Sequence, residues 1–178
     1  MIELSMHIMD IVENAVRAEA NKIYISINEN TKKDAFSIEI KDNGRGMNKK
    51  MQKKAFDPFI TTKPEKKIGL GLSLLKAAAK RCGGDLIITS SPGKGTKVKA
   101  DFVLSHIDRQ PLGNIVETIV VLITGNPEVE FIFLHKKNGE SIKWCSSRIT
   151  KNVGNKIRTS PEVINFVKED FRKIYINF

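Results

Sequence analysis

Cysteine, aromatic residues and long apolar runs are scarce in this sequence. Its 178 residues include two cysteines, Cys82 and Cys145, and neither has a second cysteine or a histidine at metal-ligand spacing. This scarcity weighs against a disulfide framework and a zinc site, and favours a reducing cytoplasm. The longest apolar run, Ile119–Gly125, is far shorter than the roughly 20 residues that cross a bilayer. The first 14 residues contain acids and no basic segment, so neither a signal peptide nor a membrane span is expected.

Acidic residues are also fewer than basic ones. The formal net charge is +10 and the pI is about 9.6, values typical of proteins that bind nucleic acids. The lysines, however, are spread over predicted loops and helix faces and have no aromatic residues between them. We therefore interpret them as a solvated surface and predict no specific nucleic-acid binding. An acidic or anionic partner is the alternative.

Apolar periodicity predicts alternating helices and strands in the first 104 residues. Ser5 could cap the first helix, and Gly83 and Gly84 end the last one. The predicted elements are a helix (4–16), two strands (22–30 and 35–42), a short helix (48–54), a long loop (56–71), a helix (72–82) and a hairpin (85–104). This order predicts helices packed on one face of a mostly antiparallel or mixed sheet.

The composition of the chain changes after residue 104. A polar linker is followed by a predicted helix at 115–123 and by a hairpin around Lys137–Gly139. A polar segment over 148–159 leads to a final helix, for which Ser160 is the predicted N-cap. We expect residues 105–178 to form a small α+β appendage.

Asp10 and Asn14 are four residues apart and therefore share one face of the first predicted helix. A carboxylate and a carboxamide oxygen side by side can hold a hydrated divalent cation or orient a water molecule. Amphipathic helices also carry such pairs on their wet face, so this pair alone is weak evidence for a site.

The segment DNGRGM, Asp42–Met47, follows a predicted buried strand. A carboxylate at the end of a buried strand needs a partner. Gly44 and Gly46 would let a planar ligand approach the backbone closely, and Met47 would add a soft apolar contact. The segment is either an ordinary turn or a slot in which Asp42 accepts a hydrogen bond from an exocyclic amino group.

Gly69 and Gly71 precede another predicted helix, and Lys63 lies shortly before them. The free N–H groups and the positive dipole end of such a helix can hold phosphate. A glycine cap is the simpler alternative, and the pattern is neither a P-loop nor a Rossmann fingerprint.

The order and spacing of these three clusters resemble the GHKL ATPase superfamily, over residues 4–104. ENAVRAEANKIYISI resembles its N box and DNGRGM its first glycine box. FDPFITTK, GLGLSLLKAAAKRCGG and SSPGKGTKVKADF resemble the later boxes in the style of histidine kinases. Small stand-alone bacterial proteins of this type resemble the whole chain most. The resemblance implies a two-layer α/β sandwich of the Bergerat type.

The resemblance also implies roles for residues of the first two clusters. Asn14 corresponds to the asparagine that holds Mg²⁺ against the phosphates. Asp10 falls where some members place a water-activating glutamate, although aspartate has a shorter reach. Asp42 corresponds to the aspartate that accepts from the adenine amino group, and Gly44 and Gly46 to glycines of the adenine pocket.

The resemblance assigns the remaining residues to the phosphates and to the far side of the adenine. Lys63 corresponds to a phosphate contact in the ATP lid. Gly69, Gly71 and Leu72 correspond to the end of the lid, where backbone N–H groups meet phosphate. Thr96 corresponds to the threonine near the adenine and its bound water.

We therefore predict a histidine-kinase-like domain at 1–104 that binds ATP and Mg²⁺. Residues 105–178 would be an accessory tail for contact with a partner or in a homodimer, or would pack on their own domain. The predicted activity is transfer of the γ-phosphate to a separate regulatory or acceptor protein in signal transduction. A slow ATPase switch and a non-catalytic, nucleotide-dependent binding module stay open as alternatives.

Overall fold

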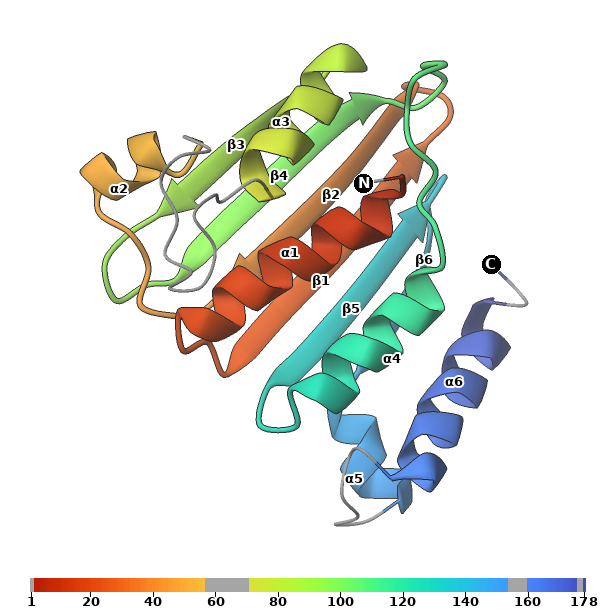
Figure 1. Cartoon of the computed structure of the whole chain (residues 1–178). Coiled ribbons are helices and arrows are strands. Elements are labelled where there is room, and N and C mark those ends of the chain that lie inside the picture. Colours follow the sequence, from red (N-terminus) through yellow and green to blue (C-terminus); the bar gives the residue numbers. More distant parts are fainter. Residues whose placement is uncertain (1, 57–70, 154–159, 176–177) are drawn as a thin grey trace.

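A computed structural model describes residues 2–56, 71–153, 160–175 and 178. The strands are β1 (Lys22–Asn30), β2 (Ala35–Asp42), β3 (Asp85–Ser90), β4 (Thr96–Val103), β5 (Glu130–Lys137) and β6 (Glu140–Cys145). The helices are α1 (Leu4–Arg17), α2 (Lys49–Lys54), α3 (Gly71–Arg81), α4 (Ile115–Gly125), α5 (Ser147–Val153) and α6 (Pro161–Tyr175). The strands form one sheet in the order β3-β4-β2-β1-β5-β6, and α1, α3, α4 and α6 lie on one face of it (Figure 1). The predicted α+β class, with helices on one face of a mixed sheet, is confirmed.

The sheet continues without a break past residue 104. β1 pairs with β2 in antiparallel orientation and with β5 in parallel orientation, so β1 joins the earlier and later strands. Ile25 of β1 lies opposite Ile40 on one side and Phe133 on the other, and each is 1% exposed. Burial of each such side chain contributes about 1.5–3 kcal/mol. The alternation read from the sequence thus places one apolar row across the centre of the sheet, beneath the helices.

The first turn of α1 is completed by a segment more than 100 residues later. The N–H groups of Leu4 and Ser5 donate to the carbonyl oxygens of Pro111 and Leu112, both at 2.9 Å. Glu3 is the N-cap residue and its side chain makes no capping hydrogen bond. The prediction that Ser5 caps this helix is wrong, because Ser5 lies inside the helix and backbone carbonyls satisfy the free N–H groups.

The predicted hairpin and final helix after residue 115 are present. Asn138 and Gly139 both have positive φ, as a two-residue hairpin turn requires. Ser160 caps α6, since its hydroxyl accepts a hydrogen bond from the N–H of Val163. The polar segment 148–159 begins with most of α5, a helix that the sequence did not indicate. Ile149, which is 1% exposed, anchors this short helix.

A buried polar cluster connects α6 to the sheet. His135 on β5 is 4% exposed, and its Nε2 atom lies 2.8 Å from Glu29 of β1. Its Nδ1 atom lies 3.0 Å from the hydroxyl of Tyr175, near the end of α6. Burial lowers the pKa of His135, so the ring is neutral and can donate to Glu29 while it accepts from Tyr175. The cluster fixes the last helix on the same face as α1.

Candidate nucleotide site

Asp42 ends β2 with its carboxylate on the face that the helices cover. The residue is 7% exposed, and its Oδ1 atom accepts hydrogen bonds from the N–H groups of Gly44 (2.9 Å) and Thr96 (3.1 Å). Burial raises the pKa of Asp42, while these two hydrogen bonds lower it. The second oxygen, Oδ2, accepts no hydrogen bond from the residues that the structure describes. A buried carboxylate is thus held by one oxygen and has acceptor capacity left on the other.

The glycine loop, residues 43–47, is packed between the end of α1 and the β3–β4 turn. The N–H of Arg45 donates to the carbonyl oxygen of Ala18 at 2.8 Å. A Cβ atom at Gly44 would lie 2.5 Å from the same oxygen, and one at Gly46 would overlap the carbonyl oxygen of Ser91. Gly46 also has a φ of +67°, a conformation that side chains disfavour. The close approach of the backbones therefore requires glycine at both positions.

Ser90, which the sequence did not single out, lies at the centre of this arrangement. Its hydroxyl accepts from the N–H of Met47 at 2.8 Å and donates to the carbonyl oxygen of Gly95 at 2.8 Å. The same hydroxyl lies 2.9 Å from the hydroxyl of Thr96. Gln52 of α2 also donates, to the carbonyl oxygens of Met47 (3.1 Å) and Ser90 (2.8 Å). These two polar side chains fix the glycine loop to the hairpin that carries Thr96.

We expect Ser90→Ala to lower the free energy of unfolding by about 1–2 kcal/mol. The change leaves the N–H of Met47 and the carbonyl of Gly95 without their partner in a partly buried place, and such groups cost about 1–3 kcal/mol. Urea denaturation followed by circular dichroism measures the change. Ser91→Ala, at the exposed neighbouring serine, is the matched control and should have little effect. Equal stability of the two variants would contradict the central role of Ser90.

Asp10 lies against the start of α3. A Cβ atom at Gly71, the first residue of that helix, would be 3.0 Å from Oδ2 of Asp10. Asn14 follows Asp10 by one helical turn, and Ala18, which contacts the glycine loop, follows by another. The side-chain amide of half-buried Asn14 makes no hydrogen bond within the described part of the chain. Helix α1 thus leads from the N-terminus of α3 to the glycine loop, with Asn14 between them.

The structure brings most of the predicted site residues into two places. Asp42, Gly44, Gly46, Met47 and Thr96 surround the glycine loop, and Asp10 and Gly71 meet at the N-terminus of α3. Leu72 is the second residue of α3 and packs against the hydrophobic core. Two further predicted residues, Lys63 and Gly69, lie outside the described residues. The roles of all these residues stay predictions.

Comparison with known proteins identifies the class. Residues 2–106 match the family described as "Histidine kinase-, DNA gyrase B-, and HSP90-like ATPase". This match spans more than half of the chain, so the chain belongs to that family, and the resemblance read from the sequence is confirmed. Membership implies ATP binding. In the part of the chain that the structure describes, no helix is long and apolar enough to cross a membrane.

Similar proteins include bacterial sensor kinases. The chain is 39% identical over 93 residues to the signal transduction histidine-protein kinase AtoS of Escherichia coli. This alignment covers 52% of the chain and 15% of AtoS. It is 32% identical over 105 residues to the sensor histidine kinase YxdK of Bacillus subtilis, covering 56% of the chain and 32% of YxdK. The sensor protein TdiS of Thauera aromatica is 29% identical over 102 residues, which are 54% of the chain and 18% of TdiS. The chain thus aligns with less than a third of each of these relatives.

Among solved structures, the Aquifex aeolicus MutL ATPase domain complexed with ADP resembles the chain in fold. The TM-score is 0.51 at 18% identity, and the match covers 80% of this chain and 63% of that one. This match extends beyond the first 106 residues and therefore includes part of the later strands and helices. The sequence relatives are named as sensor proteins and histidine kinases, and the structural likeness shows the fold.

Proposed function

We propose that the chain binds ATP·Mg²⁺ along α1 and transfers the γ-phosphate to a separate regulatory or acceptor protein in cytoplasmic signal transduction. The observation that carries the nucleotide assignment is that Oδ2 of the buried Asp42 accepts no hydrogen bond from the described residues. An adenine amino group is a donor that fits this acceptor, and Gly44 and Gly46 leave the neighbouring backbone free of side chains. Met47 and Thr96 border the same place.

Groups suited to phosphate are found at the start of α3, which lies against Asp10 in the middle of α1. N–H groups at the N-terminus of a helix can donate to phosphate oxygens, and the described part of α3 begins at Gly71. Lys63, Gly69 and Leu72 are proposed to add contacts there. Among the described residues no three histidine, cysteine or acidic side chains are grouped to hold a metal ion. A single amide oxygen from Asn14 therefore fits Mg²⁺ that takes its other ligands from phosphate and water.

We expect Asn14→Ala to weaken ATP binding about tenfold in Mg²⁺ and much less in EDTA. The amide of Asn14 has no other hydrogen bond within the described residues, so its removal should leave the fold intact. Calorimetric titration with a non-hydrolysable ATP analogue in each buffer measures the effect. Asn28→Ala, at an exposed position of β1, is the matched control. An equal loss of affinity in both buffers would remove the metal role from Asn14.

Phosphotransfer is tested with ATP labelled on the γ-phosphate. Label that moves to a protein in an extract of the native host, and is absent with Asp42→Asn, supports the kinase. The domain itself would act by positioning the phosphate and neutralising its charge. Tight binding of the analogue without label transfer or phosphate release would favour a regulatory module instead.

A slow ATPase is a second candidate, because Asp10 lies beside the N-terminus of α3, where phosphate is expected. A carboxylate there can orient and activate water. Free phosphate released by the purified chain, and abolished by the isosteric change Asp10→Asn, would support this activity. Release that is unaffected by Asp10→Asn would remove Asp10 from the catalytic role.

The proposed boundary at residue 104 separates two functions and does not separate two independently packed domains. All candidate site residues precede it, whereas residues 105–178 are proposed to serve contact with the partner or in a homodimer. In packing the two parts are joined, since β5 pairs with β1 and one hydrophobic cluster includes side chains from both.

A further inference from the structure

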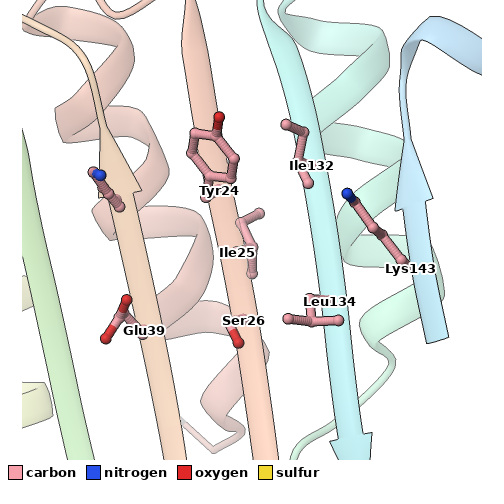
Figure 2. Close-up of a pocket in the computed structure, with 8 residues that line it drawn as sticks. Tyr24, Ile25, Ser26, Glu39, Ile132, Leu134 and Lys143 are labelled. Carbon is pink, nitrogen blue, oxygen red and sulfur yellow. The ribbon is translucent and has the colours of Figure 1, made fainter. Parts of the chain in front are cut away.

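The face of the sheet opposite the long helices carries an apolar seam where β1 and β5 meet. Tyr24 of β1 lies opposite Ile132 of β5, and Ser26 lies opposite Leu134 in the next row. Tyr24 is 39% exposed, and Ile132 and Leu134 are half-buried. Figure 2 shows these side chains around an open pocket whose base is formed by the strands. The volume of this pocket is about 340 Å³. The seam is thus an accessible apolar strip that none of the four long helices covers.

Two lysines flank this seam on opposite sides. Lys41 of β2 pairs in register with Tyr24, and Lys143 of β6 pairs with Leu134. Their strands are three strand spacings apart and Lys143 lies one row further along than Lys41, so their Cα atoms are roughly 16 Å apart. Both line the pocket together with the apolar side chains and Glu39, whose carboxylate pairs with Lys97. We call Tyr24, Lys41, Ile132, Leu134 and Lys143 the open-face patch.

The described residues do not balance the charges of the open-face patch. Neither Lys41 nor Lys143 has an acidic partner among the residues that the structure describes. Lys41 also lies directly opposite Lys97 of β4, a like-charge pair that is unfavourable. Three other lysines of this face have acidic partners: Lys22 with Glu130 (3.0 Å), Lys97 with Glu39 (3.3 Å) and Lys99 with Asp101 (2.8 Å). Lys41 and Lys143 therefore place positive charge that no described acidic side chain neutralises on both flanks of the apolar seam, and Lys136, two residues after Leu134 on β5, adds to it.

We propose that the open-face patch docks an acidic, apolar segment of a partner protein. Apolar side chains of that segment cover Tyr24, Ile132 and Leu134, and two carboxylates reach Lys41 and Lys143. In an extended segment, residues four apart are roughly 13 Å apart and point to the same side, and the long lysine side chains can reach over the remaining few ångströms. Charge complementarity favours such a segment over a neutral one and increases its rate of association.

This docking would leave the candidate nucleotide site open. Lys41 and Asp42 are adjacent in β2, and their side chains point to opposite faces of the sheet. A partner on the open-face patch and a nucleotide beside α1 therefore do not compete for space. The proposal needs no nucleotide, so its test is independent of the proposed activity.

The test uses the full chain and a fluorescein-labelled peptide with two glutamates four residues apart and leucines between them. Fluorescence anisotropy should show saturable binding that weakens as salt rises. Lys41→Glu, Lys143→Glu and Tyr24→Ser should each weaken binding at least fivefold. A peptide with lysines in place of the glutamates should bind better to the Lys41→Glu, Lys143→Glu double variant than to the parent chain.

Matched controls lie outside the patch. Lys94→Glu makes the same charge change in the β3–β4 turn, and Ile87→Ser removes an apolar side chain that is 58% exposed on β3. Both should bind the acidic peptide within twofold of the parent. Absence of binding, or equal binding by all variants, would overturn the proposal. So would patch-dependent binding to phosphatidylserine vesicles without peptide binding, or a dimer in sedimentation equilibrium that Tyr24→Ser dissociates.

Discussion

Replacement of Asp42 by asparagine should leave the chain folded and weaken binding of an ATP analogue about 100-fold. An asparagine oxygen can still accept from Gly44 and Thr96, so the glycine loop keeps its anchor. The amide nitrogen then takes the place of Oδ2 and presents N–H groups where the adenine amino group needs an acceptor. A mismatch of buried polar groups costs about 1–3 kcal/mol, and 100-fold is about 2.7 kcal/mol.

Calorimetric titration measures this loss, with Asp108→Asn, at an exposed aspartate, as the charge-matched control. Unchanged affinity of Asp42→Asn would exclude Asp42 from adenine recognition. Normal affinity of the control shows that the loss does not arise from net charge.

The same variant should be at least as stable as the parent chain at pH 7. Because burial raises the pKa of Asp42, its stabilising contribution is full below the ordinary carboxyl pKa and is lost as the pH rises through the raised value. At pH 7 the ionised carboxylate therefore opposes folding, and asparagine removes this opposition. Thermal unfolding of both chains between pH 7 and pH 4 should show the advantage of the variant decreasing toward the lower pH.

Gly95→Ala should lower the free energy of unfolding by about 2–5 kcal/mol and abolish nucleotide binding. Gly95 has a φ of +78°, and a Cβ atom there would overlap the carbonyl oxygen of Asp42. The left-handed conformation costs roughly 1–2 kcal/mol for a side chain, and displacement of packed atoms adds about 1–3 kcal/mol. The displaced atoms belong to Asp42 itself, so binding should be lost together with stability. Urea denaturation and calorimetric titration measure the two effects.

Gly93→Ala is a closely matched control in the same turn. Gly93 has a φ of +72°, but a Cβ atom there would meet nothing within 4 Å. Its substitution should therefore cost only the backbone strain of roughly 1–2 kcal/mol and preserve binding. If the two variants lose equal stability, backbone strain alone explains the effect. The close approach of Gly95 to Asp42 would then make no contribution to the free energy of unfolding.

Local patterns in the sequence predicted most of the fold. Alternating isoleucines predicted β1 and β2, and the Asn138–Gly139 turn predicted the β5–β6 hairpin. The parallel pairing of β1 with β5 could not be read in this way, because it joins segments about 100 residues apart and depends on no local signal. Helix α5 was missed because it spans only seven residues, most of them polar.

The candidate site was predictable where the residue type is special. A carboxylate after a buried strand and glycines beside it have few structural uses, so Asp42, Gly44 and Gly46 attracted attention. Ser90 and Gln52 are common residue types whose importance comes from hydrogen bonds to backbone groups distant in sequence. Such contacts exist only in the folded chain, and no spacing rule indicates them.

The hydrogen bonds at the start of α1 have a consequence for folding during synthesis. Leu4 and Ser5 are synthesised before their acceptors, Pro111 and Leu112, which follow more than 100 residues later. β1 likewise pairs with β5, which is synthesised about 100 residues later. Before β5 is available, one edge of β1 is unpaired and can pair with strands of other chains. The helix that carries Asp10 and Asn14 therefore reaches its final hydrogen bonding only after Leu112 has been synthesised. A nascent chain paused before residue 111 would be vulnerable to aggregation and would need protection by chaperones.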